Sequence, residues 1–147
     1  MGKSERSKVT AKILIEIGAI NFSLVSPFKL SSGFLSPSYI DCRKIIAYPS
    51  AFKAITNMMI DSIKFDMAPQ SPNYIIGGET AGIPFAAVIA EKMGFPLSYV
   101  RKKPKEHGRN KLIEGEILTR KNSVLAVSYT HLRAHETVRN FVCRHLL

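Results

Sequence analysis

Residues 74–100 read YIIGGETAGIPFAAVIAEKMGFPLSYV, and this stretch decides the fold class. Its apolar residues 74–76 predict a short strand, and residues 77–82, GGETAG, predict a tight turn. A helix is expected over residues 84–93, because apolar side chains recur at helical spacing and a glycine follows. Residues 97–100 predict a second strand. A strand, a glycine-rich turn, a helix and a strand form a βαβ unit, so we expect the α/β class, with a parallel sheet flanked by helices.

The flanking sequence predicts further helices and strands. Pro49 suits the first position of a second helix, and apolar residues three and four apart predict an N-terminal helix over residues 7–17. Residues 67–73, rich in proline and polar side chains, predict a loop. The other expected segments are strands at residues 24–25, 28–30, 38–42, 112–118 and 123–127, the last of them buried, and a turn at residues 31–33.

The bulk properties fit one globular domain. The chain has 147 residues, 46% of them hydrophobic. No apolar run approaches the ~20 residues of a membrane span, and the charged N-terminus lacks the apolar segment of a secretory signal. Two cysteines, Cys42 and Cys143, argue against a disulfide framework or a metal site. These features predict a cytoplasmic protein that does not bind membranes.

The formal net charge of +10 is concentrated in one region. Six basic residues and one acid, Glu106, lie between Arg101 and Lys111. A solvated charged surface is one interpretation of such a run. A basic RNA-binding domain is another, although a nucleic-acid groove is more often lined from several elements, with aromatic residues for stacking. The local excess favours one concentrated anion and no nucleic acid.

The glycine-rich turn (residues 77–82) is the second feature that favours an anion. Where a strand leads into a helix, unpartnered N–H groups and the helix dipole attract negative charge. Such turns also serve simply as connections, and GGETAG matches neither the P-loop nor the dinucleotide fingerprint. The basic loop (residues 99–108, YVRKKPKEHG) should begin at the same sheet edge as the turn. Together they predict a phosphate site with a mobile lid.

Two stretches resemble the orotate phosphoribosyltransferases. Residues 75–108, IIGGETAGIPFAAVIAEKMGFPLSYVRKKPKEHG, are similar to the middle of these proteins, and residues 28–43, FKLSSGFLSPSYIDCR, are similar to their N-terminal hood. The order and spacing of the motifs also agree, and the resemblance covers residues 8–126. It implies the type I phosphoribosyltransferase fold, here incomplete, with an N-terminal hood.

The activity implied by the resemblance is transfer of ribose 5-phosphate from phosphoribosyl pyrophosphate to N1 of orotate. The products are orotidine 5′-monophosphate, a precursor of UMP, and pyrophosphate. Mg²⁺ is implied as a cofactor bound through the pyrophosphate, with no protein metal ligands, and the intact family implies a homodimer across which the basic loop reaches. Fixed cations near a leaving group that gains charge each contribute roughly a hundredfold in rate.

The resemblance also assigns roles to residues. The positions that match contacts to phosphoribosyl pyrophosphate are Arg101, Lys102, Lys105 and His107, with Lys105 also catalytic. The positions that match the pyrophosphate loop are Glu79, Thr80, Ala81 and Gly82. Some relatives carry lysine where this chain has Ala81. Tyr39 and Ile40 match positions that line the orotate pocket in some relatives, and alternating residues of a packed strand are the other interpretation.

Two related classes are the alternatives. Another nucleobase phosphoribosyltransferase would share the sheet, but residues 36–43, SPSYIDCR, argue against it. A non-catalytic regulator that binds phosphoribosyl pyrophosphate would need a DNA-binding module.

The resemblance stops at residue 126. In the family, acidic residues and a Thr/Gly-rich loop follow and hold the ribose 5-phosphate, whereas this chain has no glycine after Gly115. Residues 127–137, VSYTHLRAHET, resemble a one-frame translation of a sequencing-library adapter. We therefore expect the N-terminal part of a phosphoribosyltransferase domain over residues 1–126 and a non-native tail over residues 127–147. Little or no transferase activity is expected of the chain as it stands.

Overall fold

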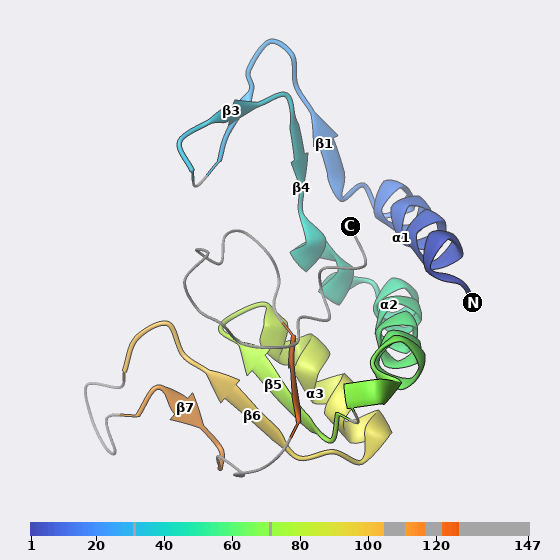
Figure 1. Ribbon diagram of the computed structural model, residues 1–147. Helices are drawn as coiled ribbons and strands as arrows, with labels where there is room; N and C mark the ends of the chain where they lie inside the picture. The colour runs from blue at the N-terminus through green and yellow to red at the C-terminus, as the bar shows by residue number, and fades with distance from the viewer. Residues whose placement is uncertain (31, 71, 105–110, 117–121, 127–147) are drawn as a thin grey trace.

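A four-stranded sheet lies at the base of the structure (Figure 1). The computed structural model describes residues 1–30, 32–70, 72–104, 111–116 and 122–126. The strands follow the order β7-β6-β5-β8, and their bounds are β5 Tyr74–Gly78, β6 Leu97–Val100, β7 Ile113–Glu114 and β8 Ser123–Ala126. Strands β6, β5 and β8 are parallel, whereas β7 runs antiparallel to β6 at the edge. The predicted α/β class is confirmed.

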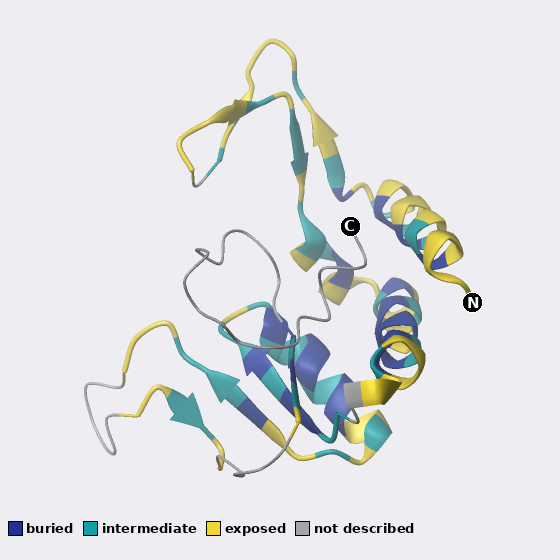
Figure 2. Ribbon diagram, in the orientation of Figure 1, coloured by how far each residue is buried: buried dark blue, intermediate teal, exposed yellow. Residues whose placement is uncertain are grey.

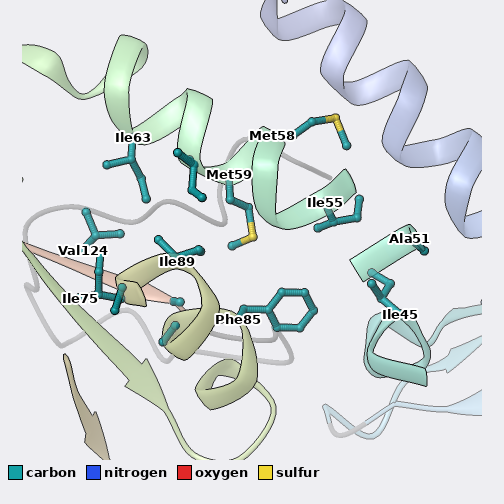
Figure 3. Packing of buried hydrophobic residues seen from close by; sticks show 14 of the residues in the cluster. Ile45, Ala51, Ile55, Met58, Met59, Ile63, Ile75, Phe85, Ile89 and Val124 are labelled. Atoms are coloured by element: carbon teal, nitrogen blue, oxygen red, sulfur yellow. The ribbon is translucent and has the colours of Figure 1, made fainter. Parts of the chain in front are cut away.

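Helix α3, Gly82–Met93, carries the chain from β5 to β6. It begins two residues earlier than predicted, because Gly82 and Ile83 already belong to its first turn. Gly94 ends it in the left-handed conformation, with φ of 64°. Apolar side chains of α3, β5 and β8 pack together in the core, among them Ile89, Ile75 and Val124 (Figure 3).

The contact between β5 and α3 is close at Gly77. A Cβ atom added there would lie 3.1 Å from Ala86 Cβ and 3.1 Å from Ile83 Cα. These contacts are tighter than most Cβ contacts in proteins, so a side chain here would require the neighbouring atoms of α3 to shift by a few tenths of an ångström.

Strands β7 and β8 differ from the prediction. The strand expected over residues 112–118 is present as Ile113–Glu114, and residues 117 and 118 lie outside the described residues. The strand expected to be buried is buried on one face: Val124 and Ala126 are in the core, while Ser123 and Leu125 are partly exposed. The alternation follows the two-residue period of a strand, whose other face points away from the helices.

Helix α2, Pro49–Asp61, lies against α3 (Figure 3). Its N-terminus is the predicted one, with Pro49 in the first turn. The Phe52 ring meets the Phe85 ring of α3 edge to face, with centroids 4.9 Å apart. The chain then continues as a π-helical turn, Ser62–Asp66, and a 3₁₀ turn, Ala68–Gln70. The second turn lies inside the segment predicted as a loop.

Helix α1, Lys3–Glu16, begins four residues earlier than predicted. The apolar pattern does not include Arg6, yet only 3% of this residue is exposed. Its guanidinium donates to the Asp66 carboxylate and, over 2.8 Å, to the Met1 carbonyl oxygen. These polar partners explain how one arginine in the otherwise exposed first turn of α1 can be buried beside the π-helical turn that follows α2.

Four short strands between α1 and α2 form the hood, residues 20–40, which projects away from the sheet (Figure 1). Its strands are β1 Ile20–Phe22, β2 Phe28–Lys29, β3 Leu35–Ser36 and β4 Ser38–Ile40, followed by the 3₁₀ helix η1, Cys42–Ala47. Antiparallel pairs join β1 to β4 and β2 to β3.

The hood corrects one predicted strand. Leu24 and Val25 form a bend, not a strand, and are 89% and 99% exposed. They lie between β1 and β2 and pair with no described strand, so the β propensity of their side chains does not produce a strand here. Figure 2 shows that most of the hood is exposed. Among the described residues, no helix is long and apolar enough to cross a membrane.

The packing at Gly77 generates a prediction about stability. Gly77→Ala should lower the free energy of unfolding by about 1–3 kcal/mol, because the added methyl overpacks the contact between β5 and α3. A urea titration followed by circular dichroism measures the change. Gly2→Ala is the control, since a Cβ at Gly2 meets nothing within 4 Å. Because Gly2 is the N-cap of α1, where alanine is less favourable than glycine, this change should cost less than about 1 kcal/mol. Equal effects of the two substitutions would contradict this account of the packing.

Candidate anion-binding site

The glycine-rich turn lies where β5 ends and α3 begins. Glu79 leaves the strand, Thr80 is exposed, and Ala81 is the residue before the helix. The peptide bond between Glu79 and Thr80 is cis. Among the residues that the structure describes, no side chain caps the start of α3, so the N–H groups of its first turn have no side-chain acceptor there. These groups and the positive end of the helix dipole suit an anion.

The start of the basic loop lies at the same sheet edge. Strand β6 ends at Val100, and Arg101 N–H donates to the Leu112 carbonyl oxygen over 2.8 Å, which closes the base of the loop. The Arg101 guanidinium lies 3.7 Å from a Glu114 carboxylate oxygen and donates to the Lys103 carbonyl oxygen. Arg101 is therefore held by the loop's own base, whereas the Lys102 side chain is exposed.

Glu79 joins the turn to the loop. Its N–H donates to the Val100 carbonyl oxygen over 2.8 Å, and its Oε2 accepts a 2.7 Å hydrogen bond from Lys102 N–H. The two features that favour an anion therefore meet through described contacts, as the βαβ unit predicted. Of the four basic-loop residues assigned to phosphoribosyl pyrophosphate, Arg101 and Lys102 are at this junction, and Lys105 and His107 lie outside the described residues.

A buried polar cluster holds the chain where it returns from the loop. The Tyr74 hydroxyl contacts Ser98 Oγ, and both hydroxyls donate to the Glu116 carbonyl oxygen. Tyr74 and Ser98 are 4% and 2% exposed, so their polar atoms need these partners. Gly115 adopts φ of 94°, and a Cβ there would lie 2.7 Å from Ser98 Oγ. Only the tertiary structure reveals this support, because its three parts are far apart in the sequence.

The predicted orotate-pocket residues lie in the hood. The Tyr39 ring packs against the Phe28 ring, with centroids 5.7 Å apart, and the Tyr39 hydroxyl accepts from the Arg43 guanidinium over 3.0 Å. Ile40 is 44% exposed. In Figure 1 their strand, β4, belongs to the hood, which projects away from the sheet.

Arg43 lies in η1, just after the hood, and the sequence assigned it no role of its own. Its Nε donates to Asp41 Oδ1 over 3.0 Å. This hydrogen bond and the Asp41 charge raise the pKa of Arg43 above its ordinary value. The guanidinium of Arg43 therefore holds the Tyr39 hydroxyl in place, while Arg43 itself is exposed to solvent.

Among the described residues, no group of three or more histidine, cysteine, aspartate or glutamate side chains could hold an ion. Of the residues assigned to the turn, the carboxylate of Glu79 already accepts the Lys102 N–H.

Comparison with known proteins identifies relatives. A protein from Cereibacter sphaeroides called orotate phosphoribosyltransferase is 47% identical over 125 residues, which are 85% of this chain and 53% of that protein. One of the same name from Roseobacter denitrificans is 49% identical over 76% of this chain and 49% of its own length. The chain is homologous to the orotate phosphoribosyltransferases. It spans about half the length of the curated relatives that it matches.

Solved structures agree with this homology. The UMP synthase of Leishmania donovani matches with a TM-score of 0.65 and 28% identity over 81% of this chain and 24% of that one. The orotate phosphoribosyltransferase of Aeropyrum pernix matches with a TM-score of 0.58 and 28% identity over 79% of this chain and 61% of that one. The yeast adenine phosphoribosyltransferase, at 20% identity and a TM-score of 0.56 over 78% of this chain and 69% of that one, shows the shared fold alone. No family model matches the chain. The predicted fold, a partial type I phosphoribosyltransferase, is confirmed, while the division at residue 126 remains a prediction.

Proposed function

We propose that this chain is the part of an orotate phosphoribosyltransferase that binds phosphoribosyl pyrophosphate. Homology to curated enzymes of that name supports the substrate class. The observation that carries the proposal is the junction at Glu79, where the turn with its uncapped helix meets the basic loop. A pyrophosphate group needs several N–H donors and cations at one place, and this edge of the sheet supplies both kinds.

The proposed chemistry is a substitution at C1 of the ribose. The bond from C1 to the pyrophosphate oxygen breaks, and pyrophosphate leaves with its electron pair. The bond from C1 to N1 of orotate forms, and N1 releases its proton to solvent. Charge grows on that leaving group, and cationic donors fixed beside it stabilise the transition state. We assign this role to Arg101, Lys102, Lys105 and His107, with Lys105 as the catalytic residue. The turn residues Glu79, Thr80, Ala81 and Gly82 form the floor of the site.

Magnesium is proposed to reach the site with the substrate. Mg²⁺ keeps several waters and is often held through substrate phosphates and few protein carboxylates. This suits a turn whose carboxylate, Glu79, is already hydrogen-bonded to the loop. When bound, the ion neutralises part of the pyrophosphate charge. The place of the reaction is proposed to be the cytoplasm, within pyrimidine nucleotide synthesis.

Ligand selection tests the substrate class. Phosphoribosyl pyrophosphate with Mg²⁺ should raise the melting temperature of the 147-residue chain, because a ligand that binds only the folded state stabilises it. Ribose 5-phosphate, which lacks the pyrophosphate, is the control and should give a smaller shift. Differential scanning fluorimetry measures both. Stabilisation by orotate but not adenine would support the orotate enzyme, the reverse would favour another nucleobase phosphoribosyltransferase, and no response to any ligand would contradict the proposed site.

A comparison of Lys102 with its neighbour Lys103 distinguishes a specific contact to the ligand from a general effect of positive charge. Lys102→Ala should weaken binding of Mg²⁺–phosphoribosyl pyrophosphate about tenfold, which corresponds to the loss of one charge-assisted contact. Lys103→Ala is the matched control, because it removes the same charge from the next exposed position of the loop. Isothermal titration calorimetry should give at most about a threefold loss for the control at 0.15 M salt, where exposed charges are screened. Equal losses would remove Lys102 from the specific contacts.

We also infer a homodimer in which the hood contacts a second copy. Large apolar side chains are more than 60% exposed on this one projecting segment, namely Phe22, Leu24, Val25, Phe34 and Leu35. Such a concentration of exposed apolar side chains is typical of a protein interface.

Sedimentation equilibrium tests the dimer. The expected mass is twice the 16.3 kDa of one chain, and Leu24→Asp should shift the equilibrium toward the monomer. Ile15→Asp, a change at an exposed apolar residue of α1 outside the hood, is the control and should leave the mass unchanged. A monomeric parent chain would contradict the inference, and so would a dimer whose mass is unchanged by Leu24→Asp.

A further inference from the structure

The hydrogen bonds around Glu79 follow the register of a parallel sheet beyond the end of β5. Gly78 pairs with Val100, and Glu79 N–H donates to the Val100 carbonyl oxygen over 2.8 Å. In a parallel ladder, the residue that donates in this way accepts the N–H two positions further along the neighbouring strand. If the ladder continued, the main-chain carbonyl of Glu79 would therefore accept Lys102 N–H.

The side chain of Glu79 takes that place. Lys102 N–H donates to Oε2 of the carboxylate over 2.7 Å. The carboxylate thus completes the ladder for Lys102, while the main chain of residues 79–81 turns out of the sheet toward α3. A hydrogen bond to a carboxylate is also stronger than one to a neutral carbonyl.

We propose that Glu79 is a positioning residue: its carboxylate replaces its own main-chain carbonyl as the acceptor for Lys102 and so holds the root of the basic loop against the glycine-rich turn. The inference rests on the proposed function, since it names what aligns the two halves of that site. A side chain is needed here because one main chain cannot both continue the sheet and turn to form the floor of the site.

Simple electrostatics makes the opposite prediction. A carboxylate beside an anion site repels the anion, so its removal should tighten binding. If Glu79 holds the loop in place, removal should weaken binding, even though a negative charge is lost. The sign of the change therefore distinguishes a positioning residue from a bystander.

Amide exchange measures the contact itself. In ¹⁵N-labelled Glu79→Ala, exchange of the Lys102 amide should accelerate about tenfold relative to the parent chain, as expected when one charge-assisted hydrogen bond is lost. Glu79→Gln keeps an oxygen acceptor and should retain most of the protection. The amides of Ile75 and Ile76 in β5 report folding, and their exchange should be the same in all three proteins. Unchanged exchange at Lys102 in Glu79→Ala would overturn the inference.

Titration with Mg²⁺–pyrophosphate measures the consequence. Glu79→Ala should bind this probe about tenfold more weakly than the parent chain, and Glu79→Gln should bind as well or more tightly, because it keeps the acceptor and loses the charge. Tighter binding by both variants would overturn the positioning role and leave the proposed function intact. No binding by the parent chain would overturn the proposed function and the ligand part of the inference, whereas the exchange result would stand by itself.

Discussion

Strands β5 and β6 run parallel because helix α3 carries the chain from the end of one back to the start of the other. This crossover brings the carboxyl ends of both strands to one edge of the sheet. The glycine-rich turn and the basic loop start there for that reason, although the helix separates them in the sequence. The close approach of α3 to β5, which the absence of a side chain at Gly77 permits, keeps the start of the helix beside the turn.

Acidic residues hold the base of the basic loop. The chain carries a net charge of +10, yet the base of the basic loop is held by Glu114, which pairs with Arg101, and by Glu79, which accepts Lys102 N–H. A loop rich in like charges repels itself, and acids at its base offset part of that repulsion where the geometry must be fixed. The Lys102 side chain is left exposed.

The hood and the sheet are stabilised by different interactions. The sheet packs against α3, and α3 against α2, so its strands are stabilised by the apolar core (Figure 3). The hood strands are two or three residues long and carry large exposed apolar side chains. Short hairpins of this kind are marginal alone, which agrees with a role in contact with a second chain. Arg43, which lies in η1 and is hydrogen-bonded to Asp41, ties the hood to η1 through the Tyr39 hydroxyl.

The sequence by itself determined the βαβ unit, the α/β class and the positions of the glycine-rich turn and the start of the basic loop, because strand and helix periodicity and turn glycines are local properties. It also placed α2 at Pro49 and β6 at residues 97–100. The tertiary structure alone decided the contacts between distant residues. The periodicity could not show that Arg6 pairs with Asp66, that Tyr74 and Ser98 hold the Glu116 carbonyl, or that Glu79 completes the ladder for Lys102. Each of these contacts joins polar groups that are far apart in the sequence. A buried polar atom is stabilised by the partner that the fold brings to it, and periodicity does not identify that partner.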